Sequence, residues 1–121
     1  MSAHDRDIEI LKKVIGYCDE IEAARGRFGD SIDALVADTD YKNAVSMCIL
    51  QIGELTTHLS GEFKKKYSAQ PWQDITGMRN VAAHHYGKFD VEILWKTISV
   101  KIPELKAYCH GSIEAMAIYG R

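Results

Sequence analysis

The sequence predicts an all-α protein, an antiparallel up-and-down bundle with four to five main helices. Apolar residues recur at spacings of three and four along most of the 121-residue chain, which is the period of an amphipathic α-helix. No segment alternates apolar and polar residues as a half-buried strand would. The connections between the predicted helices are short, and short connections favour antiparallel neighbours.

The composition indicates a single domain that spans residues 1–121. Apolar residues make up 46% of the chain, which has two prolines and no Ser/Gly/Pro-rich stretch, so we expect neither a linker nor a disordered tail. No apolar run approaches the ~20 residues that cross a bilayer, and the N-terminus lacks a secretory signal. We therefore expect a cytoplasmic protein without membrane contact. The formal net charge of −2 means that nucleic acid could be bound only by a local site.

The first helix is predicted to run from about Asp5 to Ala24, because apolar side chains recur there every three or four residues. The Arg-Gly-Arg-Phe-Gly stretch at 25–29 contains two glycines and is expected to end this helix. After it, Ser31 is a suitable N-cap residue for a short helix at about 32–37.

The third predicted helix has the strongest amphipathic pattern in the chain. Residues 38–40 supply candidate caps at its start, and Ser60-Gly61 interrupts the pattern near its end. The apolar positions follow the spacing 4-3-4-3-4-4 and are Tyr41, Val45, Cys48, Ile52, Leu55, Leu59 and Phe63.

Two further helices are predicted in the second half of the chain. Pro71 suits the first turn of a helix, so the fourth helix should start near Trp72 and reach about Tyr86. Asp90 can cap the last helix, and Pro103 is expected to kink that helix or to split it in two.

Metal and disulfide chemistry are not indicated. Cysteine at an apolar helix position acts as a small hydrophobe, and three widely separated positions of this kind hold Cys18, Cys48 and Cys109. The histidines outside the fourth helix show no ligand spacing. We therefore expect no disulfide, no metal site and no cofactor.

The candidate chemistry lies on the fourth predicted helix. Within eight residues it has an arginine, an asparagine, a histidine and a tyrosine: Arg79, Asn80, His84 and Tyr86. A guanidinium can hold a phosphate through a two-pronged hydrogen bond, and an imidazole can transfer protons near pH 7. These two groups suit the cleavage of a phosphodiester without a metal.

A helical projection places these residues together. At about 100° per residue, the four side chains fall on one arc with the small Ala83, which would leave room for a ligand. His85 falls on the apolar side with Met78, so the geometry favours His84 as the reactive imidazole. A polar helix end with salt bridges or caps would explain the same residues without any chemistry, and short motifs have many chance matches.

The wider pattern resembles a known family. The residues that carry the resemblance are Ile52-Gly53-Glu54, 63–67, 71–80, His84-x-Tyr86, Asp90, Trp95 and 103–105. Over nearly the whole chain, to about residue 105, they resemble the HepT-like family of HEPN-domain proteins. The resemblance implies a helical domain that forms a homodimer or a higher homo-oligomer and brings the arginine–histidine motif of two subunits into one cleft. It also implies a metal-independent ribonuclease that acts on RNA as the toxin of a type VII toxin–antitoxin system.

The resemblance also assigns roles to individual residues. It makes Arg79 and His84 the catalytic pair and Asn80 a supporting residue. Tyr86 matches the tyrosine that a minimal nucleotidyltransferase antitoxin (MntA-like) modifies with AMP. Two other functions stay open: a non-catalytic HEPN module that binds substrate or nucleotide for a partner nucleotidyltransferase, and an assembly subunit with a vestigial site.

Two features outside the fourth helix stay open as well. The run Lys64–Lys66 could contact an RNA backbone, but a solvated helix end explains it equally. A glycine inside a helix costs ~1 kcal/mol relative to alanine, so Gly53 indicates a close approach of another helix. Its neighbour Glu54 is a candidate supporting residue.

Overall fold

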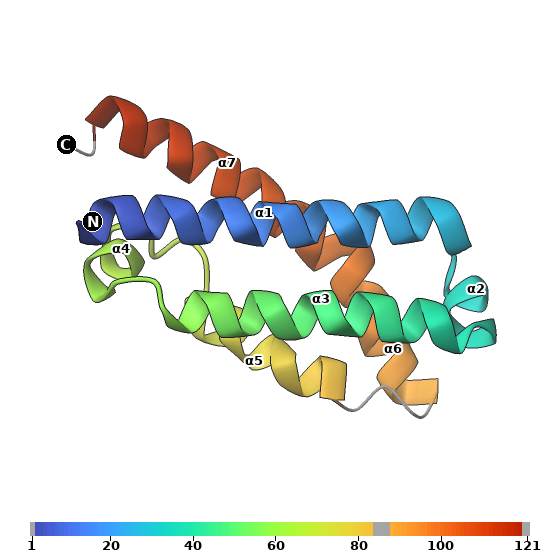
Figure 1. The fold of residues 1–121 in the computed structure, drawn as a ribbon. Helices are drawn as coiled ribbons and strands as arrows, with labels where there is room; N and C mark the ends of the chain where they lie inside the picture. Colours follow the sequence, from blue (N-terminus) through green and yellow to red (C-terminus); the bar gives the residue numbers. More distant parts are fainter. Residues whose placement is uncertain (1, 84–87, 120–121) are drawn as a thin grey trace.

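The computed structural model describes residues 2–83 and 88–119. Its helices, labelled in Figure 1, are α1 (Ala3–Phe28), α2 (Ile32–Ala37), α3 (Thr39–Thr57), α4 (Gly61–Lys66), α5 (Trp72–Ala83), α6 (Lys88–Lys96), the π-helical segment η1 (Thr97–Lys101) and α7 (Ile102–Tyr119). The described residues contain no β-strand, which confirms the predicted all-α class.

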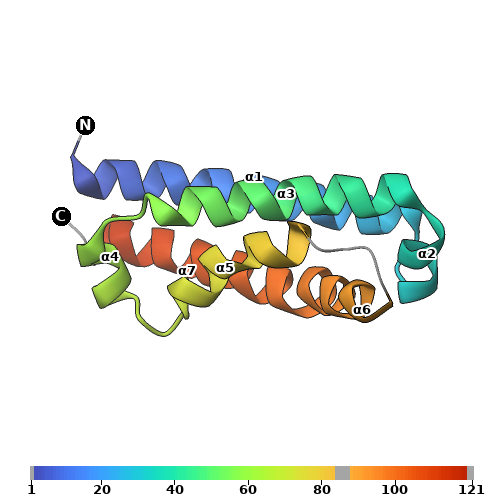
Figure 2. The same cartoon turned by 90° about the horizontal axis from the view of Figure 1, so that it is seen from below.

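The long helices α1 and α3 lie side by side and run in opposite directions (Figure 1). On the far side of α1 the chain returns as α7, while α5 packs against α3. Seen from below, α1 and α3 form one layer, and α5, α6 and α7 lie beneath them as a second layer (Figure 2). The arrangement is the predicted up-and-down bundle.

Helix α1 is one turn longer than predicted. It continues through 25–28 and ends at Gly29, whose φ of 125° is a backbone conformation that favours glycine. The ring of Phe28 stacks on Tyr41 of α3, with 5.2 Å between the ring centroids. This contact between helices stabilises the last turn of α1. Helix α2 has the predicted bounds, and the Ser31 hydroxyl accepts a hydrogen bond from the Ala34 N–H at 3.2 Å.

The predicted third helix is divided in two. Helix α3 ends at Thr57, and Phe63 lies on the separate short helix α4. The hydroxyl of Ser60 caps α4 by accepting a hydrogen bond from the Phe63 N–H at 3.1 Å. Asp7 of α1 accepts two further hydrogen bonds, from the Ser60 N–H at 2.8 Å and from its hydroxyl at 2.6 Å. The buried Asp7 therefore fixes the start of α4.

Asp90 is not the N-cap of the last helix. Helix α6 begins at Lys88, so Asp90 is its third residue and the prediction was wrong. The helix starts one half-turn before the acidic residue that looked like its boundary.

Where a kink or a split was predicted at Pro103, the helical run is unbroken but passes through the π-helical segment η1 just before the proline. The Ile102 N–H bonds to the carbonyl of Thr97, five residues back, which is the π-helical pattern. The next donor in this pattern would be residue 103, but proline has no N–H. The carbonyl of Ile98 is left without that helical partner, and Nη1 of Arg25 on α1 donates to it at 3.4 Å.

The core contains most of the apolar positions that the periodicity predicted. Those found buried include Leu11, Cys18, Tyr41, Val45, Ile52, Phe63, Leu94, Ile98, Leu105 and Cys109. The three cysteines are free and buried, which confirms that they are packing residues. Among the described residues, no helix combines the length and the apolar character that crossing a membrane requires.

Candidate functional site

The close approach predicted at Gly53 is confirmed. Helix α5 packs on α3 so that the aliphatic stem of Arg79 crosses the α3 backbone at this glycine. A Cβ atom at Gly53 would collide with Cγ of Arg79 and would lie 3.1 Å from its Cδ and from the carbonyl oxygen of Thr76. The missing side chain at Gly53 is therefore what lets Arg79 lie there.

A pair of threonines holds the two helices together beside this crossing. The hydroxyl oxygens of Thr56 on α3 and Thr76 on α5 are 3.1 Å apart and share a hydrogen bond. Thr56 also donates to the carbonyl of Gly53 at 3.0 Å when its hydroxyl turns towards its own helix. Because Thr56 is fully buried, these contacts set the distance between α3 and α5 next to Arg79.

The guanidinium of Arg79 extends from the crossing to a carboxylate. Its Nη1 lies 2.8 Å from Oε2 of Glu54. The other carboxylate oxygen, Oε1, lies 3.4 Å from Nε2 of His58, one turn further along α3. The side chains of Arg79, Glu54 and His58 are 43%, 56% and 66% exposed, so all three can be reached from solvent.

The burial of side chains along α5 can be compared with the helical projection for the described residues. Its buried side chains are Trp72, Ile75, Met78 and Ala82, while Arg79 and Asn80 are exposed. Met78 lies on the apolar side as expected. Arg79 stands at the edge of the buried face, which is why its stem contacts α3 while its guanidinium meets solvent.

The other predicted site residues are not placed. His84 and Tyr86 lie outside the described residues, and so does His85. Their assigned roles therefore stay predictions. The same holds for the arc that they were expected to share with Arg79 and Asn80.

The described residues contain no group of three His, Cys, Asp or Glu side chains that could hold a metal ion. Lys64–Lys66 form the last turn of α4, where basic side chains offset the partial negative charge of a helix C-terminus. This position accounts for the run without a role in RNA binding. Glu54, expected only as a candidate supporting residue, is a direct partner of Arg79; the sequence did not predict that contact.

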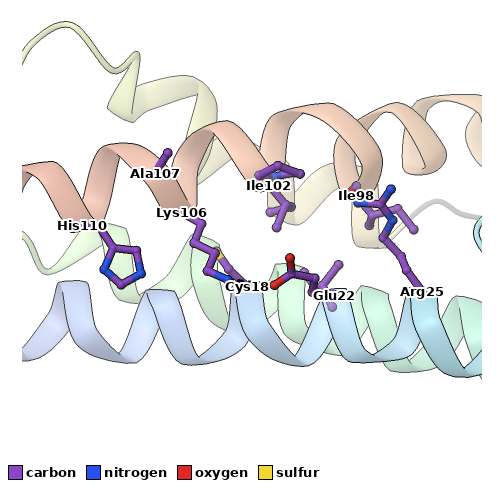
Figure 3. Close-up of a pocket in the computed structure, with 10 residues that line it drawn as sticks. Cys18, Glu22, Arg25, Ile98, Ile102, Lys106, Ala107 and His110 are labelled. Atoms are coloured by element: carbon purple, nitrogen blue, oxygen red, sulfur yellow. Dashed lines mark hydrogen bonds and ion pairs between the residues drawn. The ribbon is translucent and has the colours of Figure 1, made fainter.

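A separate cavity of about 300 Å³ lies between α1 and the η1–α7 segment (Figure 3). Glu22 and Arg25 point into it from α1, and Lys106 reaches from α7 towards α1. The ammonium of Lys106 is 2.7 Å from Asp19 and 2.8 Å from Glu22, and Arg25 is paired with Asp30 at 2.8 Å. Both cations at this cavity are therefore paired with carboxylates.

Comparison with known families matches residues 14–111 to the family described as Ribonuclease HepT-like. The matched range includes Arg79, Asn80, His84 and Tyr86. It also includes Gly53 and Glu54, so the whole crossing of α3 and α5 lies within the family match. No solved structure matches the chain.

Several individual proteins are similar to this chain. One from Caldanaerobacter subterraneus subsp. tengcongensis, named "Putative RNase", is 37% identical over 78 residues, which are 64% of this chain and 70% of the relative. A protein of Thermococcus cleftensis named "Probable ribonuclease HepT" is 34% identical over 71 residues, or 59% and 64% of the two chains. One of the similar proteins from Methanocaldococcus jannaschii, also named "Putative RNase", is 30% identical over 104 residues, which are 84% of this chain and 86% of the relative.

Proposed function

Because the chain belongs to the Ribonuclease HepT-like family, we propose that residues 1–121 form one domain that cuts RNA without a metal ion and acts as the toxin of a type VII toxin–antitoxin system. The observation that carries the proposal is the placement of Arg79. Its guanidinium is exposed on α5, and its stem is set against α3 at Gly53. A fixed, reachable guanidinium is well suited to bind a phosphate through two hydrogen bonds.

Arg79 binds the phosphate at the bond to be cut. Its charge offsets the negative charge that grows on the phosphoryl oxygens as the reaction proceeds. Asn80, the next residue and also exposed, supports the site with an amide that can donate to a second oxygen. These two residues supply binding and charge stabilisation, but neither can transfer a proton near pH 7.

His84 supplies the proton transfers. One His84 accepts the proton of the ribose 2′-hydroxyl, the 2′-oxygen attacks phosphorus, and the bond from phosphorus to the 5′-oxygen breaks. His84 of the partner subunit donates a proton to the leaving 5′-oxygen. The products are a 2′,3′-cyclic phosphate and a 5′-hydroxyl end, and general acid–base catalysis of this kind contributes on the order of 10²–10⁴-fold.

Two subunits are needed because one imidazole cannot be base and acid in the same step. A two-fold axis next to the site would provide both groups from identical chains. The surface beside Arg79 supports this arrangement. Met47 and Leu50 of α3 are 56% and 36% exposed. Leu50 is three residues after Met47 and four before Glu54, so the three side chains share one face of the helix. A second copy that covers these apolar side chains would lie next to Arg79.

Tyr86 gives the site an off-switch. Its modification with AMP by a nucleotidyltransferase antitoxin would place a phosphate and a bulky base two positions from His84. The added negative charge would compete for Arg79 and repel RNA. Coexpression with the nucleotidyltransferase should therefore give a mass increase of one AMP on Tyr86. The same increase on Tyr41 or Tyr67 instead would contradict the switch.

The alternative is a non-catalytic HEPN module that binds substrate or nucleotide for a partner nucleotidyltransferase. Such a module would use Arg79 as a phosphate ligand but would have no use for a titrating imidazole at His84. Binding without cleavage, lost in Arg79→Ala and retained in His84→Ala, is the result that favours this module.

The deciding experiment is incubation of the purified protein with a mixed RNA pool in EDTA. We expect cleavage by the wild type and none by Arg79→Ala or His84→Ala, with unchanged thermal unfolding in all three. His110→Ala is the matched control, because His110 is exposed on α7 at the rim of the separate cavity. Cleavage that survives in His84→Ala would mean that another residue or a contaminant is responsible.

A further inference from the structure

We propose that Glu54 is a positioning residue that holds Arg79 ready for the phosphate, an inference that rests on the proposed function. Oε2 of Glu54 accepts a hydrogen bond from Nη1 of Arg79 at 2.8 Å. Glu54 lies on α3 and Arg79 on α5, so the contact joins the two helices that meet at Gly53.

Arg79 is held at two points along its side chain. Its Cγ and Cδ lie over Gly53, where a methyl group would displace them. Its guanidinium is held by Glu54, the residue that follows Gly53 on α3. A free arginine side chain samples many rotamers and loses that freedom when it binds. An arginine already fixed at stem and tip loses less, which favours phosphate binding in one orientation.

The carboxylate is itself held on its second oxygen. Oε1 of Glu54 lies 3.4 Å from Nε2 of His58, four residues on and therefore on the same face of α3. The carboxylate thus lies between an imidazole and a guanidinium, with one oxygen near each. His58 acts only through Glu54 in this arrangement.

Glu54 does not block the phosphate from Arg79. A guanidinium has five N–H donors on three nitrogens, and the contact to Glu54 is made by Nη1. The fork can hold a carboxylate on one side and a phosphate on another. The negative charge of Glu54 does, however, repel the incoming phosphate, so the same residue improves orientation and weakens binding.

Stability does not explain the arrangement. The pair is about half exposed on both sides, and ion pairs of this kind add little to folding. The close packing of α5 on α3 accounts for glycine at position 53, but it does not require a carboxylate at position 54. We therefore assign the contact between Glu54 and Arg79 to the site.

The test compares Glu54→Ala with Glu54→Gln on a defined RNA, with kcat, KM and thermal unfolding measured for each. In Glu54→Ala the guanidinium loses its anchor, and we expect kcat to fall about tenfold or more, since small misplacements of a reacting group are this costly. In Glu54→Gln the amide oxygen still accepts from Arg79 and the charge is gone. We expect its kcat to stay within about twofold of the wild type and its KM to fall or stay equal.

Two controls separate this role from its alternatives. Glu114→Ala removes one exposed carboxylate from α7 and should leave kcat, KM and the unfolding midpoint unchanged. The unfolding midpoint of Glu54→Ala should also stay at the wild-type value, because a structural role would lower it. Arg79→Ala, measured alongside, should be inactive whatever residue 54 is.

Two results would overturn the inference. One is a Glu54→Ala variant with wild-type kcat in an assay where Arg79→Ala is inactive. The other is a Glu54→Gln variant as slow as Glu54→Ala, since the retained hydrogen bond should rescue the site. Absence of cleavage by the wild type is a different outcome: it overturns the proposed function, and the positioning role with it.

Discussion

The aliphatic stem of Arg79 lies over Gly53 of α3, in the space that any other residue at position 53 would fill. The two residues are 26 positions apart in sequence and belong to different helices. A glycine on one helix therefore determines where a guanidinium on another can point. The relationship can be tested without any change to Arg79.

Gly53→Ala should impair RNA cleavage more than it impairs folding. The new methyl group must displace Cγ of Arg79 and compress against the carbonyl oxygen of Thr76, which lies 3.1 Å away. Overpacking of this kind costs about 1–3 kcal/mol, while alanine gains ~1 kcal/mol of helix propensity over glycine. We expect a net loss of stability below about 2 kcal/mol and a fall of about tenfold or more in kcat/KM. Urea unfolding and initial cleavage rates measure the two effects.

Gly16→Ala is the matched control for this variant. Gly16 also lies inside a long helix, α1, but an added Cβ there would meet nothing within 4 Å. The substitution should stabilise the protein by about 0.5–1 kcal/mol and leave cleavage unchanged. If Gly53→Ala cleaves RNA as fast as Gly16→Ala, the position of Arg79 over α3 has no importance for catalysis.

The sequence predicted elements best where the decisive signal was local. Ser31 and the residues after it predicted α2 with the correct bounds, because an N-cap acts within three residues. The end of α1 depended instead on the stacking of Phe28 on Tyr41, a contact between helices. The two glycines at 25–29 looked like a break, but only Gly29 adopts a conformation that ends the helix.

In the candidate site, too, the sequence predicted the local features but not the contacts between helices. The glycine at 53 predicted that a helix would approach there, and the motif on α5 singled out Arg79 and Asn80. That Glu54 pairs with Arg79 depends on the register between α3 and α5, which the threonine pair helps to set. No local pattern encodes that register. The buried Asp7 was missed for a similar reason, because an acid in the second turn of a helix looks like a surface residue until its partner is known.

A substrate without the 2′-hydroxyl should resist cleavage. In the proposed reaction the nucleophile is the 2′-oxygen of the RNA itself, so DNA of the same sequence offers nothing to attack phosphorus. We expect no DNA cleavage under conditions where RNA is fully cut. RNA with one deoxynucleotide should resist only at the bond that follows it. Mass spectrometry of the RNA fragments should find 2′,3′-cyclic phosphate ends, and cleaved DNA would point to attack by water instead.

Asp7→Ala should destabilise the bundle more than any change of an exposed acid on α1. Asp7 is 4% exposed and accepts hydrogen bonds from the N–H and the hydroxyl of Ser60. Hydrogen bonds to a charged group contribute about 1.5–3 kcal/mol each and are not fully additive, so we expect a loss of about 3 kcal/mol in the free energy of unfolding. Glu9→Ala, two positions on and exposed, should change it by less than about 0.5 kcal/mol. Urea denaturation of the two variants measures the difference, and equal stabilities would show that the tie between α1 and α4 is not needed.

The three cysteines should make stability fall at alkaline pH. Burial raises the pKa of Cys18 and of Cys109 from 9.0 to about 12. Burial, together with the nearby carboxylate of Glu20, raises the pKa of Cys48 to about 11. Above pH 9 the unfolded chain therefore loses thiol protons that the folded chain keeps. The contribution of these thiols to stability is complete below about pH 9 and is lost as the pH rises towards 11–12.

The thiols can be followed directly, because the thiolate is the reactive form. At pH 8 we expect a disulfide reagent to react slowly with the native protein and to titrate three thiols per chain once denaturant is added. Cys48, at 9% exposure against 1% for Cys18 and 0% for Cys109, should be modified first in the native protein, and Cys48→Ala should remove that first phase. Rapid reaction of all three in the native state would mean that the helices of the bundle open far more often than this packing allows. A loss of stability between pH 9 and 11 that is unchanged in Cys18→Ala and Cys109→Ala would assign the alkaline loss to other groups.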